Sequence, residues 1–350
     1  MKNFINYFYN LNINNLRLID NNYYFNYKNK NFIFYQIKEP FFDYRAIFEL
    51  NSFIEQKNQS NYKIIPNKNN EIITFTDDKK YVLLIDFFDR DRVFDYYDIL
   101  KTNILVDENN KMIYRLDKSK WNVLWKTKVD YFEDFINKNI NKFPEFNRYY
   151  NYFIGLSENA ISYFEDTLAF EKKSGRDKKV VSHKRIEKTF SFKQLNNPMG
   201  LVVDHPTRDL AEYLKTKFWA NDYNYEYIQN CLDAINLSDY GARLLISRLM
   251  FPSFFFDSYE KLIDNSLFSD DINIMIGRAN EYEIYLNNIY EILKQKHNIP
   301  DINWLKKVDH QSTLTTPNTS GISFTNIDSI PSFKVTSIIL QWLQAPNIFM

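Results

Sequence analysis

The stretch GLVVDHPTRDLAEYLK, residues 200–215, changes character twice along its length. The apolar run at 201–203 is typical of a buried strand, and Pro206 restricts the backbone of His205 in front of it. Asp209 then precedes LAEYL, at a position where a carboxylate caps free backbone N–H groups and faces the positive end of a helix. The stretch therefore predicts a strand, a turn and a helix over about 208–219, with Asp209 in a structural role.

The N-terminal part of the chain shows the signals of a small β-rich lobe. Aromatic and β-branched runs flank a polar Asn-Lys turn between residues 16 and 38, which is typical of a hairpin. After Pro40, apolar residues follow a helical stripe over 42–56, and Asp43 is placed to cap that helix. Three further strands are expected, joined by Asn- and Asp-rich turns: YKIIP, EIITFTDD and KYVLLIDFF.

From about residue 92 onward the periodicity becomes helical. An aromatic stripe spaced by three or four residues runs through 120–140 and is typical of a buried helix face. The run LSENAISYFEDTLAF at 156–170 predicts another helix, with Ser157 as its N-cap. The aromatic stripe comprises Trp121, Trp125, Val129, Phe132 and Ile136. Further helices are expected at 93–100, 239–250 and 272–296.

These patterns predict three segments. Residues 1–91 form the β-rich N-terminal lobe, residues 92–307 form the helical C-terminal lobe, and residues 308–350 form a Ser/Thr-rich tail. Between residues 311 and 350 only Asp328 and Lys334 are charged, so we expect an appended segment rather than part of either core.

Composition excludes several classes of protein. The 44 Lys and Arg residues balance 44 Asp and Glu residues, which argues against a general binder of nucleic acid or of anionic membrane surfaces. No run approaches the roughly 18 apolar residues of a membrane span, so we expect synthesis in the cytoplasm. Cys231, the only cysteine, allows no intramolecular disulfide and is expected to be a buried thiol. Nothing in the sequence predicts the oligomeric state.

Glycine usage excludes the common phosphate-binding loops from the first half of the chain. The first of the six glycines is Gly155. A loop that wraps phosphates with its backbone N–H groups needs positive φ or close backbone approach, which glycine supplies at least cost. The N-terminal lobe therefore has neither a Walker loop nor a kinase glycine-rich loop.

Four stretches carry a family resemblance: KWNVLWKTKVDYFEDF (120–135), FIGLSENAISYFED (153–166), VSHKRI (181–186) and VDHPTRDLAEYLK (203–215). In this order they resemble the spore-coat-associated kinase-like family that includes CotS. The resemblance runs from about residue 15 to Leu305. It implies an α+β fold of two lobes, like the protein kinases and the aminoglycoside phosphotransferase and choline kinase superfamily. It also implies localisation at the endospore coat, with other spore-coat proteins as partners.

The resemblance places a catalytic loop at VSHKRIEKTF. In active members of the superfamily this loop reads His-x-Asp and then Asn, because phosphoryl transfer uses a carboxylate to orient the hydroxyl and an amide to hold magnesium. Here the corresponding residues are His183, Arg185 and Phe190. A guanidinium stays protonated and a phenyl ring has no oxygen for a hard cation, so we expect this loop to lack both base and metal ligand. The expected role of His183 is then structural: its side chain holds the backbone of this loop in place.

Three further positions are candidates for nucleotide binding. Asp204 is placed to be the metal-binding acid after strand LVV, but a second register puts Gly200 there and leaves the acid missing. Lys38 and Glu49 are placed to form the ion pair that grips phosphates in kinases. Their alternative interpretation is a solvated lysine at a strand end and a surface glutamate. No spacing of His, Cys, Asp and Glu predicts a metal site.

The basic run over 172–188 has two interpretations. One is a solvated loop. The other is that Arg185 and its neighbours Lys178, Lys179 and Lys184 fill the former phosphate cleft or bind an acidic partner.

The sequence thus favours a kinase-like protein without classical kinase activity, with a structural or assembly role at the spore coat and no cofactor. The alternative is an active small-molecule phosphotransferase that uses ATP and magnesium through Lys38, His183 and Asp204. A third hypothesis is a cytoplasmic binding module with no role in spores.

Overall fold

The computed structural model describes residues 1–38, 42–57, 59–76, 78–88, 91–139, 147–170, 174–187, 189–263 and 269–305, so the predicted tail at 308–350 lies outside the described residues. The described chain divides into two compact units. The sheet unit comprises Met1–Ser119 and Lys179–Asp204, and the helical unit comprises Lys120–Lys178 and residues 205–305. The sheet unit therefore includes residues 92–119 and 179–204 in addition to the β-rich segment expected at 1–91.

An antiparallel sheet forms the centre of the sheet unit. Among the described residues its strands lie in the order β1-β2-β3-β6-β4, and β5 pairs with β6. Strands β2 and β3 form the expected hairpin, whose turn residues Lys28 and Asn29 both have positive φ, as a two-residue hairpin turn requires. The strands are β1 (Arg17–Ile19), β2 (Asn22–Tyr27), β3 (Lys30–Ile37), β4 (Tyr62–Ile65), β5 (Thr74–Phe75) and β6 (Lys80–Asp86).

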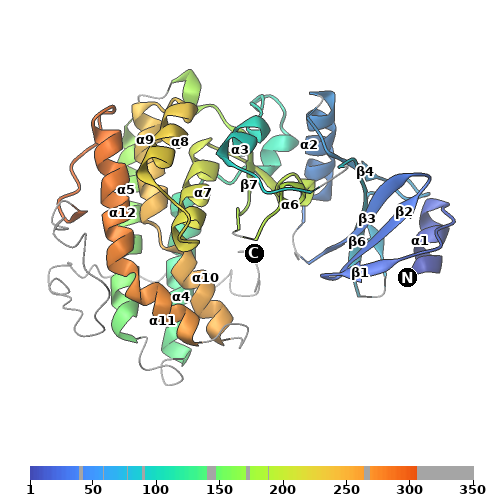
Figure 1. Ribbon diagram of the computed structural model, residues 1–350, viewed down its shortest axis with the longest axis horizontal. Coiled ribbons are helices and arrows are strands. Elements are labelled where there is room, and N and C mark those ends of the chain that lie inside the picture. The colour runs from blue at the N-terminus through green and yellow to red at the C-terminus, as the bar shows by residue number, and fades with distance from the viewer. Residues whose placement is uncertain are drawn as a thin grey trace. The chain divides into compact units, whose positions relative to one another are not determined.

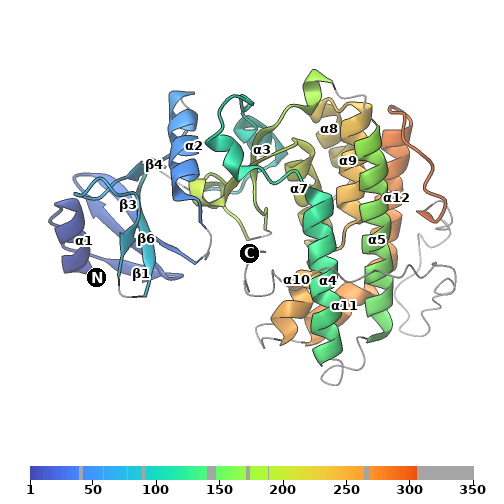
Figure 2. The same ribbon diagram turned by 180° about the vertical axis from the view of Figure 1, so that it is seen from behind.

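Both faces of this sheet are covered by helices (Figures 1 and 2). Side chains alternate along a strand, so Phe32 and Phe34 of β3 join the cluster under α1 (Lys2–Tyr9), while Ile33 and Ile37 join the cluster under α2 (Tyr44–Gln56). The double coverage explains why β6 is apolar almost throughout. Helix α1 was not predicted, whereas α2 begins after Asp43, whose carboxylate accepts the N–H of Ala46 at 3.2 Å as expected.

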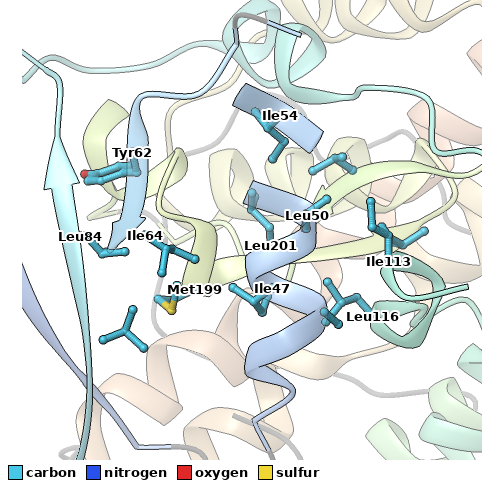
Figure 3. Close-up of a cluster of buried hydrophobic side chains, with 14 of the residues drawn as sticks. Ile47, Leu50, Ile54, Tyr62, Ile64, Leu84, Ile113, Leu116, Met199 and Leu201 are labelled. Carbon is cyan, nitrogen blue, oxygen red and sulfur yellow. The ribbon is translucent and has the colours of Figure 1, made fainter. Parts of the chain in front are cut away.

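Helix α2 also packs against a second, two-stranded sheet. Strands β7 (Val180–His183) and β8 (Leu201–Asp204) pair antiparallel, and both are fully buried. Figure 3 shows Ile47 and Leu50 of α2 among Leu84 of the large sheet, Leu116 of η1 (Ile113–Leu116) and Leu201 of β8. One apolar cluster therefore joins the large sheet, α2 and the β7–β8 hairpin.

Two short helices complete the described parts of the sheet unit. Helix α3 (Tyr96–Thr102) is capped by a reciprocal pair, Asp95 and Asp98. Helix α6 (Phe192–Leu195) begins after Ser191 with the same kind of cap, and η4 (Pro198–Gly200) follows it.

Long helices form the helical unit, where α5, α9 and α12 run side by side (Figures 1 and 2). The predicted aromatic stripe of α4 is buried along its whole length, which confirms it as a core face. The helices are α4 (Trp121–Asn139), α5 (Asn147–Ala169), α7 (Thr207–Trp219), α8 (Tyr225–Ile235), α9 (Asp239–Met250), α10 (Ser253–Ile263), α11 (Ser269–Gly277) and α12 (Ala279–Lys294), with the short η3 (Gly175–Asp177) after α5. No helix within the described ranges has both the length and the apolar character to cross a bilayer.

Two expectations for the helical unit were wrong. Ser157 is not an N-cap, because α5 begins at Asn147 and Ser157 lies inside it, donating to the carbonyl of Phe153 at 2.7 Å. The segment 272–296 is not one helix, because α11 ends at Gly277, a poor helix former. Arg278 marks the break, and its guanidinium lies 4.4 Å from the ring centre of Phe218.

Helix α7 is buried on every side from Thr207 to Lys215, charged residues included. Glu212 pairs with Arg248 of α9 at 3.3 Å, and the ammonium of Lys215 donates to the carbonyl of Phe251 at 2.8 Å. Buried charges are tolerated only when they are paired or hydrogen-bonded. Asp209 is fully buried near the start of α7, as its expected structural role requires.

Replacing Leu50 tests the cluster that joins α2 to both sheets. Because Leu50 is fully buried, Leu50→Ala is expected to lower the free energy of unfolding by about 2–5 kcal/mol through lost apolar burial and a residual cavity. Urea unfolding followed by circular dichroism measures the change. Leu18→Ala on β1, where the side chain is 61 % exposed, is the matched control and is expected to cost less than about 0.5 kcal/mol. Equal losses for the two variants would contradict the assigned cluster.

Candidate functional site

The β7–β8 hairpin carries the two ends of the candidate site. His183 closes β7 and Asp204 closes β8, and both side chains are buried. In the antiparallel register His183 lies opposite Leu201, while Asp204 lies opposite Val180. The two residues are therefore at opposite ends of the hairpin, about 10 Å apart along the strands at roughly 3.3 Å per residue.

Arg185 and Phe190 lie in the loop that follows β7, and both are half-buried. The loop folds back on the hairpin, since the N–H of Lys184 donates to the carbonyl of Gly200 at 2.8 Å. The ammonium of Lys184 donates to the carbonyl of Met199 at 3.1 Å and lies 5.7 Å from the ring centre of Phe42. Lys184 therefore contributes to the structure of the hairpin.

Lys38 and Glu49 are not brought together. Lys38 directly follows β3 and Glu49 lies on α2, and both side chains are exposed. No ion pair joins them in the part of the chain that the structure describes. Apolar packing, and not a pair between these charges, determines where α2 lies against the sheet.

A clamp that the sequence did not reveal fastens α6 to the end of β6. The ammonium of Lys193 lies 2.9 Å from Oδ2 of Asp86 and 3.4 Å from the carbonyl of Phe88. The backbone N–H of Lys193 donates to Asp91 at 3.1 Å, and its carbonyl accepts the hydroxyl of Tyr62 at 3.1 Å. Both ends of Lys193 thus connect the segment after β7 to strand β6 and the segment that follows β6.

Arg92 extends this clamp. Its guanidinium binds both carboxylate oxygens of Asp98, at 2.6 and 2.7 Å, and lies 3.8 Å from the ring centre of Phe192. The hydrogen bonds from Arg92 lower the pKa of Asp98 and outweigh the effect of burial. The N–H of Phe192 donates to the carbonyl of Arg92 at 2.8 Å, so backbone and side chain of one residue hold the start of α6.

Only part of this clamp has a local signal in the sequence. The reciprocal cap of Asp95 and Asp98 is a spacing that can be read from the chain. The pair of Asp86 and Lys193 joins residues more than a hundred positions apart, and no periodicity relates them.

The basic run of 172–188 divides into different environments. Lys179 forms an ion pair with Asp117 and lies 5.3 Å from the ring centre of Tyr114. Burial raises the pKa of Asp117, but hydrogen bonds from Lys179 and Ser119 outweigh it and lower the pKa. Lys178 is exposed, and residues 171–173 and 188 lie outside the described residues.

The described residues contain no group of three or more His, Cys, Asp and Glu side chains arranged to hold a metal ion. Asp204 is the acid that ends β8, and its neighbours in the strand are Val202 and Val203. Two sequence candidates, Arg185 and Phe190, carry no oxygen that a magnesium ion can use.

Comparison with known proteins gives both a family and a fold. The family model described as "Spore coat putative kinase YutH" matches residues 2–289. The endospore coat-associated protein YutH of Bacillus subtilis (strain 168) is 32% identical over 209 residues, which cover 54% of this chain and 62% of that protein. The match therefore spans less than two thirds of the relative's length.

Two solved structures are similar in fold. An aminoglycoside phosphotransferase from Alicyclobacillus acidocaldarius aligns with a TM-score of 0.55 and 10% identity, over 82% of this chain and 94% of its own. A spectinomycin phosphotransferase in complex with ADP and spectinomycin aligns with a TM-score of 0.53 and 11% identity, over 84% and 96%. The kinase-like α+β fold expected from the sequence is thus confirmed, with a small antiparallel sheet unit and a larger helical unit.

Replacing Lys193 tests the clamp. Lys193→Met keeps the aliphatic stem but leaves the buried carboxylate of Asp86 without its cation, so we expect the free energy of unfolding to fall by about 1–3 kcal/mol. Chemical unfolding monitored by tryptophan fluorescence measures this. Lys63→Met, which breaks an exposed pair with Glu55 in the same unit, is expected to cost under about 1 kcal/mol. Equal decreases in the free energy of unfolding for Lys193→Met and Lys63→Met would contradict the clamp.

Proposed function

Since this chain belongs to the spore coat YutH family, we propose that it acts at the endospore coat as a structural or assembly component and does not transfer phosphate. The Bacillus subtilis relative, an endospore coat-associated protein, supports the location. The proposed partners are other spore-coat proteins, which the chain meets after synthesis in the cytoplasm.

The chemistry of the loop after β7 carries the second half of this proposal. Phosphoryl transfer in kinase-like folds uses positioned carboxylates and metal ligands, with little other chemistry for the protein to supply. Arg185 stands where the carboxylate base is expected, and its guanidinium stays protonated at any pH at which the protein is folded. Phe190 stands where the metal-binding amide is expected. We therefore propose that this loop is degenerate.

The surroundings of the loop support a structural role. Lys184 is engaged with the hairpin backbone, and α6 is fastened to β6 through Lys193 and to the following segment through Arg92. Lys38 and Glu49, the pair placed to hold phosphates, are both exposed, and no ion pair joins them in the described residues. The side chains of Arg185 and Phe190 offer magnesium no oxygen at the positions where the resemblance places the base and the metal ligand, so we propose that the protein works without ATP and magnesium.

Nucleotide binding is the direct test of this proposal. Saturating a site at about 100 times its dissociation constant adds about 2.7 kcal/mol of stability, which raises the melting temperature by several degrees. We expect no saturable shift when ATP and magnesium are titrated into the full chain. The spectinomycin phosphotransferase, solved with ADP, is the positive control for the assay. A saturable shift with turnover that Asp204→Asn abolishes would support an active phosphotransferase instead.

Localisation during sporulation tests the proposed place of action. A fluorescent fusion of the full chain, expressed from its own promoter, is expected to collect at the forespore surface as the coat assembles. The fluorescent protein alone, from the same promoter, is the control. A signal that stays diffuse throughout sporulation favours a cytoplasmic binding module over a coat component.

A further inference from the structure

A buried carboxylate in the helical unit binds three separate segments. Asp177, at the end of η3, accepts the N–H and the hydroxyl of Ser174 at its Oδ2 atom, at 2.5 and 2.9 Å. Its Oδ1 atom lies 3.2 Å from Nε2 of His205 and also accepts the hydroxyl of Ser238. Both oxygens of one carboxylate are therefore used.

The hydrogen-bond network assigns the proton on His205. The backbone N–H of Thr207 donates to Nδ1 of His205 at 3.2 Å, so Nδ1 is the acceptor. Nδ1 also lies 2.8 Å from Oγ1 of Thr207. In the neutral ring, which carries one N–H, the proton then lies on Nε2 and is donated to Asp177. His205 thus connects Asp177 to Thr207, the first residue of α7.

Ser238 connects the same carboxylate to α9. Its hydroxyl oxygen accepts the N–H of Gly241 at 2.8 Å and so caps the helix. The α-carbon of Gly241 approaches the His205 ring closely, since an added Cβ would lie 3.3 Å from Cε1. Segments that end at Asp177, begin at His205 and begin at Ser238 therefore meet at one point.

The bond between Asp177 and His205 joins the two ends of the segment that carries the candidate site. The chain leaves the helical unit after Lys178 and re-enters it at His205. The segment that contains β7, α6 and β8 thus has Asp177 shortly before it and His205 directly after it. A hydrogen bond between them closes residues 178–204 into a loop with a fixed base.

The contact is well shielded from solvent. The side chains of Asp177 and His205 are 2% and 7% exposed. Burial raises the pKa of Asp177, but hydrogen bonds from His205, Ser238 and Ser174 outweigh it and hold the pKa at about 2. The carboxylate is therefore ionised over the pH range in which proteins usually fold, and the bonds to it are charge-assisted.

We propose that Asp177, His205 and Ser238 form a latch that controls local opening of residues 178–204, the segment that bears His183, Arg185 and Asp204. Proteins open in cooperative local units, and the frequency of opening depends on the bonds that must break. While the latch is closed, Asp177 before the hairpin and His205 after it stay bonded to each other, and Asp177 also stays bonded to Ser238. When it breaks, the hairpin opens without global unfolding.

Hydrogen exchange of the full chain measures this opening. A lost hydrogen bond to a buried charge is worth about 1.5–3 kcal/mol, or roughly 10- to 100-fold in an equilibrium. We expect Asp177→Ala to speed amide exchange by that factor in residues 180–183 and 201–205. Exchange in β2, β3 and α12 is expected to stay unchanged. Asp222→Ala, which removes a 70% exposed carboxylate from the same unit, is the matched control and is expected to change nothing in these residues.

Ser238→Ala keeps the test decisive if Asp177→Ala does not fold. It removes one neutral donor, so we expect acceleration of roughly 3- to 10-fold in the same residues, together with the first turn of α9. Unchanged exchange in residues 180–183 and 201–205 in both folded variants would overturn the latch. So would a uniform increase across all protected amides, because that pattern reports global destabilisation.

Discussion

The burial of helix α2 between the large sheet and the β7–β8 hairpin fixes where the candidate site residues lie. Ile47 and Leu50 fill the space between Leu84 of the sheet and Leu201 of the hairpin (Figure 3). Protein interiors are close-packed, so a helix held by such contacts has little freedom to shift. Apolar packing therefore holds α2 in place, and no ion pair between Lys38 and Glu49 is present in the described residues to add to it.

Charged side chains in this protein mainly connect elements. Asp86 with Lys193, Glu212 with Arg248, and Lys128 with Asp257 at 2.6 Å each join segments that are distant in sequence. A buried charge is stable only with its partner, so each pair specifies which elements meet. Perturbed or buried ionisable groups often mark catalytic sites, but each of these three pairs has a structural explanation in the elements that it joins.

A family and a fold together leave the activity open. The same fold supports many activities, and function depends on the residues of the site. The proposed function rests on the loop after β7, where a guanidinium and a phenyl ring stand at the positions at which the resemblance places a base and a metal ligand. The clamp joins α6 to β6 and to the segment after it, and the proposed latch joins the two ends of residues 178–204.

The sequence by itself determined the local elements and the type of residue at each loop position. Periodicity predicted the stripe of α4 and the cap of Asp43, because these depend on neighbours three or four residues apart. It failed at Ser157, which lies inside α5 and donates its hydroxyl to the carbonyl of Phe153. Only the tertiary structure placed His183 and Asp204 at opposite ends of one hairpin and joined Asp177 to His205. Those relations depend on strand register and on contacts between distant segments, which no spacing along the chain encodes.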